Sequence, residues 1–358
     1  MPRPQRVTIR EIARMTGVST QTVSRVINKR PDVSPATREA VEAAIAQVGF
    51  QPSEVARSLV QRRSLTLGVI IAGLRFFGVS QTLNGITEES ERAGYGLLLK
   101  EVERFDTDDI VPVVDFLAAH RVEGIIFAAP LAGFGAETLV GRLPATSPPL
   151  VLLKAPPTRA YTTIGIDNYG GARKATEHLI ALGRRRIAHV SGPLDWLESQ
   201  DRERGWRDAL DDAGLTPGSS HEGTWSSASG EAAFQAILAA DPGVDGLFAG
   251  NDQMALGVLR AAHARGIVIP DQLAVVGFDG LDESAQFVPS LTTVVQPLPE
   301  LGRLAVRHLL AYLDAEAGGA AIEDIVLSTE LIIRESAPAA EGPLESRTAA
   351  AQGATIGD

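Results

Sequence analysis

A regular alternation of short apolar runs and longer helical stretches fills most of this chain. The apolar runs cover residues 67–72, 96–99, 124–128, 150–153, 187–190, 246–249 and 273–278. Strands that alternate with helices form parallel sheets with helices on both faces. About 270 residues follow this pattern, which is more than one sheet comfortably holds. The sequence therefore predicts an α/β fold with two lobes.

The basic residues gather at the N-terminus although the chain as a whole is acidic. The net charge of the 358 residues is -11. Residues 1–63 carry 11 Lys or Arg against 5 Asp or Glu, whereas the remainder carries 22 against 39. A basic segment on an acidic body is typical of a head that contacts nucleic-acid phosphates.

Three helical patterns lie within the basic segment, at residues 8–15, 19–28 and 34–49. Gly17 separates the first two patterns, and a helix, a glycine turn and a second helix in this space are typical of a helix-turn-helix. The third pattern begins with Ser34 and Pro35, which favour the cap and the first turn of a helix. The expected N-caps are Thr8, Ser19 and Ser34.

The basic segment and the α/β region resemble a known family. The segment TIREIARMTGVSTQTVSRVINKRPDVSPATREAVEAAIAQVGFQPSEVARSLV is similar to the DNA-binding head of the lactose-repressor (LacI) family, nearly continuously over residues 7–60. The α/β region resembles the effector-binding core of the same family to about residue 336. The resemblance implies a two-lobed core like that of periplasmic binding proteins.

The second helix of the head is the expected recognition helix, which places its N-terminal side chains against base edges in the major groove. Gln pairs bidentately with adenine and Arg with guanine. The resemblance puts base reading at Thr20, Gln21 and Arg25. Hydroxyl groups that could donate to phosphates, and so fix the register on DNA, belong to Ser19, Thr22 and Ser24.

Residues 52–64 form the expected hinge helix and linker. Val55, Ala56 and Leu59 share one apolar face of a helix too short to be stable alone. The resemblance implies that this helix folds only on the operator, where two copies pack together and insert leucines into the minor groove. Leu59 is the matching leucine, and an apolar wedge of this kind kinks DNA.

Polar and aromatic side chains follow several of the predicted strands, where ligands of α/β folds bind. Arg, Asn and Asp suit the hydroxyl groups of a polyol, and an indole packs on the apolar side of a sugar ring. The resemblance places ligand contacts at Arg202, Asn251 and Asp279, with Trp225 from GTWSSASG and Gln296 from TTVVQP. Trp196 and Phe76 fall where relatives line the pocket.

Lys154 departs from the family pattern. Many relatives carry an aspartate that faces the ligand at the end of this strand, and a lysine accepts no hydrogen bond. Lys154 therefore either leaves a ligand hydroxyl to other groups or attracts a carboxylate or phosphate on the ligand. Two alternatives stay open: the alignment with the family is off by one residue, or Lys154 points to solvent.

Two aspartates near the cleft are expected to cap helices rather than to bind ligand. Asp252 is predicted to cap a helix that begins at Gln253. Asp167 is a candidate cap for a helix near Gly170.

The expected domains follow from these patterns. They are the DNA-binding head at 1–51, the hinge at 52–64, one core lobe at 65–166 with 298–325, the other at 167–297 with 326–337, and a disordered tail at 338–358. The tail lacks a leucine heptad, so a homodimer is expected rather than a larger coiled-coil assembly.

Several function classes are excluded by what the sequence lacks. There are no cysteines, so disulfides and thiolate chemistry are absent. No apolar run approaches the ~20 residues of a membrane span, and no signal peptide follows the N-terminal arginines. Phosphate-binding loops, nucleophile elbows and metal-ligand spacing are also missing. We therefore expect a soluble cytoplasmic regulator without enzymatic activity, cofactor, metal or membrane partner.

The sequence predicts a repressor whose affinity for operator DNA changes when a small ligand, a sugar or sugar derivative, binds between the lobes. A purine- or nucleoside-responsive regulator, or one governed by a phosphoprotein, stays open as an alternative. A solute receptor for transport would share the cleft, but it would need a signal peptide and would have no use for residues 7–60.

Overall fold

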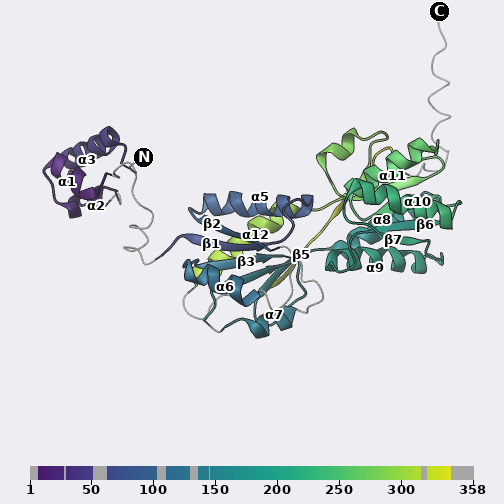
Figure 1. The fold of residues 1–358 in the computed structure, drawn as a ribbon, viewed down its shortest axis with the longest axis horizontal. Helices are drawn as coiled ribbons and strands as arrows, with labels where there is room; N and C mark the ends of the chain where they lie inside the picture. The colour runs from purple at the N-terminus through teal and green to yellow at the C-terminus, as the bar shows by residue number, and fades with distance from the viewer. Residues whose placement is uncertain are drawn as a thin grey trace, which may run out of the picture. The chain divides into compact units, whose positions relative to one another are not determined.

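The fold is described from a computed structural model that covers residues 7–27, 30–50, 63–102, 110–129, 136–144, 146–315 and 321–339 (Figure 1). The chain divides into two compact units, Met1–Leu65 and Thr66–Asp358. The predicted hinge residues Val55, Ala56 and Leu59 lie outside the described residues, as does the tail from residue 340.

The head unit is a bundle of three helices, as the sequence predicts. They are α1 (Ile9–Thr16), α2 (Thr20–Ile27) and α3 (Pro35–Val48). Its core holds the buried side chains of Ile12, Ala13, Val23, Val26, Val41 and Ala44. Gly17 ends α1 with a φ of 67°, a conformation that glycine adopts without steric cost.

Two of the three expected N-caps are confirmed by hydrogen bonds. The Ser34 hydroxyl accepts from the amide of Thr37 at 3.3 Å, and the Ser19 hydroxyl accepts from the amide of Thr22 at 3.0 Å. Thr8 stands at the N-cap of α1, but its side chain makes no capping hydrogen bond.

The second unit contains two six-stranded sheets, which confirms the predicted α/β fold with two lobes. The first sheet has the order β11-β5-β4-β3-β1-β2. Its strands are β1 (Thr66–Ile71), β2 (Gly96–Glu101), β3 (Gly124–Ala128), β4 (Leu150–Leu153), β5 (Thr162–Ile166) and β11 (Asp324–Leu327). The flanking helices are α5 (Phe77–Arg92) and α12 (Leu298–Asp314) on one face and α6 (Ile110–Ala119) and α7 (Ala136–Arg142) on the other (Figure 1).

The second sheet repeats this arrangement, with the order β12-β10-β9-β8-β6-β7. Its strands are β6 (Ile187–Ser191), β7 (Ser220–Glu222), β8 (Gly246–Ala249), β9 (Ala274–Asp279), β10 (Thr292–Val295) and β12 (Glu330–Ile332). The helices α10 (Ser227–Ala240) and α11 (Asp252–Ala264) pack on one face, and α8 (Asn168–Ala181) and α9 (Leu197–Asp212) pack on the other. Strand β12 is antiparallel to β10, while the other pairs of this sheet are parallel.

The chain passes between the lobes three times, after β5, after β10 and after β11. Strand β11 stays in the first sheet to Leu327, past the lobe boundary predicted at residue 325. The chain then stays with the second lobe, where Ala337 is fully buried. Among the described residues, no helix is long and apolar enough to cross a bilayer.

Candidate functional site

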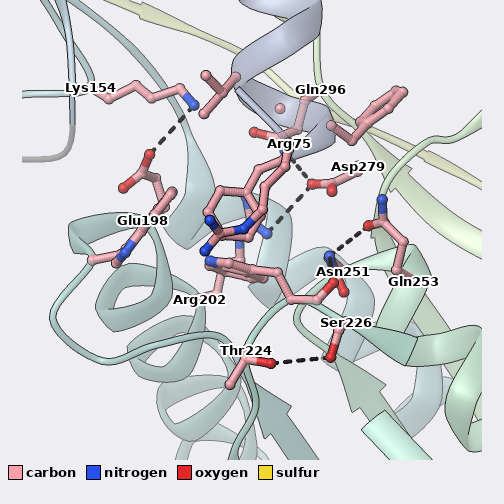
Figure 2. Close-up of a pocket in the computed structure, with 16 residues that line it drawn as sticks. Arg75, Lys154, Glu198, Arg202, Thr224, Ser226, Asn251, Gln253, Asp279 and Gln296 are labelled. Carbon is pink, nitrogen blue, oxygen red and sulfur yellow. Dashed lines mark hydrogen bonds and ion pairs between the residues drawn. The ribbon is translucent and has the colours of Figure 1, made fainter. Parts of the chain in front are cut away.

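A cavity of about 380 Å³ opens between the two lobes. This volume falls in the range of small-molecule sites. All eight residues that the sequence singles out for ligand binding line it, although their contact with a ligand stays a prediction. The lining consists of Arg75, Phe76, Phe77, Gly78, Val79, Lys154, Trp196, Glu198, Arg202, Thr224, Trp225, Ser226, Asn251, Gln253, Asp279 and Gln296 (Figure 2).

Three aromatic rings form one wall of the cavity. Phe76 precedes α5 in the first lobe, whereas Trp196 and Trp225 belong to the second lobe. The ring centroids of Phe76 and Trp196 are 5.4 Å apart, and those of Trp196 and Trp225 are 5.8 Å apart. The aromatic wall therefore continues across the boundary between the lobes.

The position of Trp225 depends on Gly192, which follows β6. A Cβ atom on Gly192 would overlap the indole ring of Trp225. The backbone of Trp225 has a φ of 65°, a conformation that is uncommon for a bulky residue. Its indole Nε1–H is buried without a hydrogen-bond acceptor among the described residues.

Arg202 is held from three sides at the floor of the cavity. Its Nε donates to Oδ1 of Asn168 at 2.9 Å, and its Nη1 donates to the carbonyl oxygen of Gly250. The same Nη1 lies 3.6 Å from Oδ1 of Asp279. These contacts hold the guanidinium in a fixed position at the cavity.

Asp279 ends β9 and points into the cavity with a φ of 113°. Gln296 Nε2 donates to its Oδ1 at 2.6 Å. Burial raises the pKa of Asp279 to about 6, against the opposing effects of Arg202 and Gln296. Asp279 therefore presents hydrogen-bond acceptors to the cavity from a strained backbone conformation.

Backbone strain is concentrated in this cavity. Among the described residues, five other than glycine have a positive φ, and three of them, Lys154, Trp225 and Asp279, line the cavity. Such conformations cost about 1–3 kcal/mol each and cluster at functional sites. The strain supports the assignment of this cavity as the functional one.

The prediction that Asp252 caps α11 is wrong. Asn251 is the N-cap, and its Oδ1 accepts from the amide of Met254 at 2.8 Å. Its Nδ2 donates to the carbonyl oxygen of Trp225 and to the side chain of Gln253. Asn251 therefore positions Trp225, and a ligand would have to compete for bonds that are already made.

Asp252 instead organises the loop after β9. Its carboxylate accepts from the amides of Gly280 and Leu281 and from the hydroxyls of Ser284 and Thr293, at 2.5 to 3.0 Å. Burial raises the pKa of Asp252 to about 7, although these donors oppose the shift. The expected cap at Asp167 is confirmed, because its Oδ1 accepts from the amide of Gly170 at 2.7 Å and α8 begins at Asn168.

Lys154 points into the cavity rather than to solvent. Its Nζ lies 3.5 Å from Oε1 of Glu198, and the side chains are 14% and 8% exposed. The two residues face each other in Figure 2. The sequence prediction did not include Glu198. Its position in the first turn of α9, the helix that follows β6, could have indicated that it lies at the cleft.

The predicted DNA-reading residues lie on one helix of the head. Thr20, Gln21 and Arg25 are exposed on α2, opposite the buried Val23 and Val26. Arg25 forms an exposed ion pair with Asp32 at 3.5 Å, which is weak enough to yield to DNA. Ser19 is exposed, and Thr22 and Ser24 are half-buried.

Comparisons with known proteins agree with both units. The model of the bacterial regulatory proteins of the lacI family matches residues 8–53, and the periplasmic binding protein-like domain matches residues 176–337. The lactose operon repressor of Escherichia coli (strain K12) is 33% identical over 311 residues, which cover 87% of this chain and 86% of that repressor. The chain belongs to the lacI family.

Solved structures of lacI-family proteins share the fold along most of the chain. The lac repressor dimer bound to operator and the anti-inducer ONPF has a TM-score of 0.85 at 32% identity and covers 94% of this chain and 100% of that one. The complex of the transcriptional regulator CelR with cellobiose has a TM-score of 0.67 at 31% identity, with 92% and 100% covered. Among the described residues of this lacI-family protein, no acidic, histidine or cysteine cluster could hold a metal ion.

Proposed function

We propose that this lacI-family protein is a repressor that binds operator DNA as a homodimer, and that a neutral carbohydrate in the cleft between its lobes changes its affinity for the operator. One observation carries the effector class. The cleft combines an aromatic wall with two ion pairs, Lys154 with Glu198 and Arg202 with Asp279.

The aromatic wall suits a sugar ring. Aromatic faces pack against the C–H groups of a sugar, while the surrounding Arg, Asp and Gln side chains meet its hydroxyl groups. The planes of Phe76 and Trp196 are 89° apart, and those of Trp196 and Trp225 are 66° apart. These neighbouring rings form no parallel slot for a planar base, which favours a sugar over a purine.

The charges inside the cleft favour a neutral ligand. The half-buried Lys154 and the buried Arg202 each face a carboxylate within 3.6 Å. The further cation of the lining, Arg75, is exposed. An acidic ligand would meet Glu198 and Asp279 as well as the cations. The similarity to the CelR–cellobiose complex supports the same effector class.

Operator binding and dimerisation are supported by the head and by the relatives. The exposed face of α2 carries the side chains that read base edges, and the lac repressor structure is a dimer on its operator. A ligand that favours one arrangement of the lobes can change operator affinity 5- to 150-fold through ~1–3 kcal/mol of coupling.

Thermal unfolding of the full chain against sugars, sugar acids, sugar phosphates and purines tests this proposal. A ligand at 100 times its dissociation constant stabilises the folded state by about 2.7 kcal/mol. We expect a neutral sugar to give the largest shift and to change operator affinity in a DNA-binding assay. A purine as the strongest ligand would contradict the proposed effector, and unchanged operator affinity would contradict the proposed coupling.

A further inference from the structure

Lys154 and Glu198 form an ion pair that connects the two lobes inside the cleft. Lys154 follows β4 of the first sheet, whereas Glu198 lies in the first turn of α9, which packs on the second sheet. The distance of 3.5 Å between Nζ and Oε1 therefore spans the cleft (Figure 2).

This pair has unused capacity for hydrogen bonds. An ammonium group has three donors, and a carboxylate has two acceptor oxygens. The side chains of Lys154 and Glu198 are 14% and 8% exposed, and neither forms a hydrogen bond with another described residue. Both residues line the cavity, so their remaining donors and acceptors offer a place for polar groups of a ligand.

Without Glu198, the surroundings of Lys154 would attract an anion. Its Nζ lies 3.9 Å from the position that a Cβ on Gly78 would take, at the start of α5. The N-cap Phe76 makes no capping hydrogen bond, and the amides of Phe77 and Gly78 have no acceptor among the described residues. A lysine beside free amides at a helix N-terminus favours carboxylates and phosphates.

We propose that Glu198 sets the charge selectivity of the cleft. It pairs with Lys154 and repels carboxylates and phosphates that the lysine and the start of α5 would otherwise bind. A hydroxyl group can donate to Glu198 and accept from Lys154 at the same time, so a neutral sugar reaches the pair without displacing either charge. This inference rests on the proposed carbohydrate effector and names the residue that selects its charge.

The test compares the full-length wild type with Glu198→Gln by titration calorimetry, using cellobiose, lactose, gluconate and glucose 6-phosphate as probes. We expect the wild type to bind a neutral probe and to reject both anions. Glu198→Gln leaves the lysine unpaired, so its affinity for gluconate or glucose 6-phosphate should rise at least tenfold. Its affinity for the neutral probe should fall roughly tenfold, because a hydrogen bond to a charged group is lost.

Three further variants make the result specific. Lys154→Met should lose affinity for the neutral probe without any gain for the anions. Glu203→Gln is the matched control, since Glu203 lies on the same helix and pairs with Arg207 at 3.3 Å outside the cleft; it should change neither affinity. Glu198→Ser also leaves Lys154 unpaired, and it replaces Glu198→Gln if that variant does not fold.

The outcomes separate the inference from the proposed function. A wild type that binds a neutral sugar, with no gain of anion binding in folded Glu198→Gln or Glu198→Ser, would overturn the role of Glu198 and leave the carbohydrate effector standing. A wild type that binds an anion as tightly as any neutral probe would overturn both. If no neutral probe binds but Glu198→Gln gains anion binding, the charge selectivity is supported and the choice of effector is not.

Discussion

Trp225 reaches its place in the aromatic wall because Gly192 leaves room for the indole ring. Gly192→Ala would force the ring away. We expect the affinity for the proposed effector sugar to fall roughly tenfold, because an aromatic contact is worth about 0.5–1.5 kcal/mol beyond its buried area. Titration calorimetry with the sugar that gives the largest thermal shift measures the change. Gly165→Ala is the matched control, since a Cβ there meets nothing within 4 Å.

Asp252 should make the stability of the second lobe depend on pH. Burial raises the pKa of Asp252 to about 7, well above its ordinary value, so the folded chain holds this proton more tightly than the unfolded chain. Its contribution to the unfolding free energy is therefore fully present below about pH 4 and is lost as the pH rises through 7. Asp252→Asn removes this titration.

The unfolding free energy of Asp252→Asn should consequently fall further below that of the wild type, by about 2 kcal/mol, as the pH is lowered from 8 to 5. Urea unfolding of both proteins at several pH values measures it. A deficit that stays constant over this interval would show that the four hydrogen bonds to the carboxylate outweigh its burial.

The cleft residues could be predicted from the family resemblance and from their position after strands, but the different roles of adjacent residues could not. Asn251 and Asp252 both follow β8 and both favour helix starts. Their roles differ because the segment after β9 brings three donors to Asp252 and β10 brings a fourth. These contacts join segments 28 or more residues apart. Glu198 was missed for a related reason, since its partner Lys154 comes from the other lobe.

At the scale of elements, Thr8 and Ser34 both stand at the N-cap of a helix of the head, but they differ in their hydrogen bonds. The hydroxyl of Ser34 caps α3, whereas the side chain of Thr8 makes no capping bond at α1. Ser34→Ala should therefore destabilise the head by about 1 kcal/mol, whereas Thr8→Ala should leave it unchanged. Amide hydrogen exchange of head peptides, with peptides of the core as internal reference, should be about fivefold faster in Ser34→Ala alone.

The buried, apolar strands were predictable, whereas β5 and β11 were not. Strands β1, β3, β4, β8 and β9 are apolar because helices cover both faces, and their burial is nearly continuous. Strand β5 carries Thr and Gly, and β11 begins with an exposed aspartate. Such strands form because a neighbouring strand offers hydrogen bonds, which the local sequence does not reveal.

At the scale of the whole molecule, the resemblance assigns operator binding and effector binding to separate parts of the chain. Leu59→Ala removes the predicted apolar wedge, and we expect operator affinity to fall at least tenfold because the DNA kink is no longer supported. The thermal shift caused by the effector sugar should be unchanged. Gel-shift titrations and thermal unfolding measure the two effects. Unaltered operator affinity would remove Leu59 from the DNA interface.

The three passages of the chain between the lobes also bear on how such proteins diversify. Neither lobe is encoded by one continuous stretch, because β11 and α12 return to the first lobe and β12 to the second. A single genetic crossover between related genes cannot exchange a complete lobe, so the cleft is inherited largely as one unit. The head is continuous in sequence, and one crossover suffices to give the same effector sensor a new set of target genes.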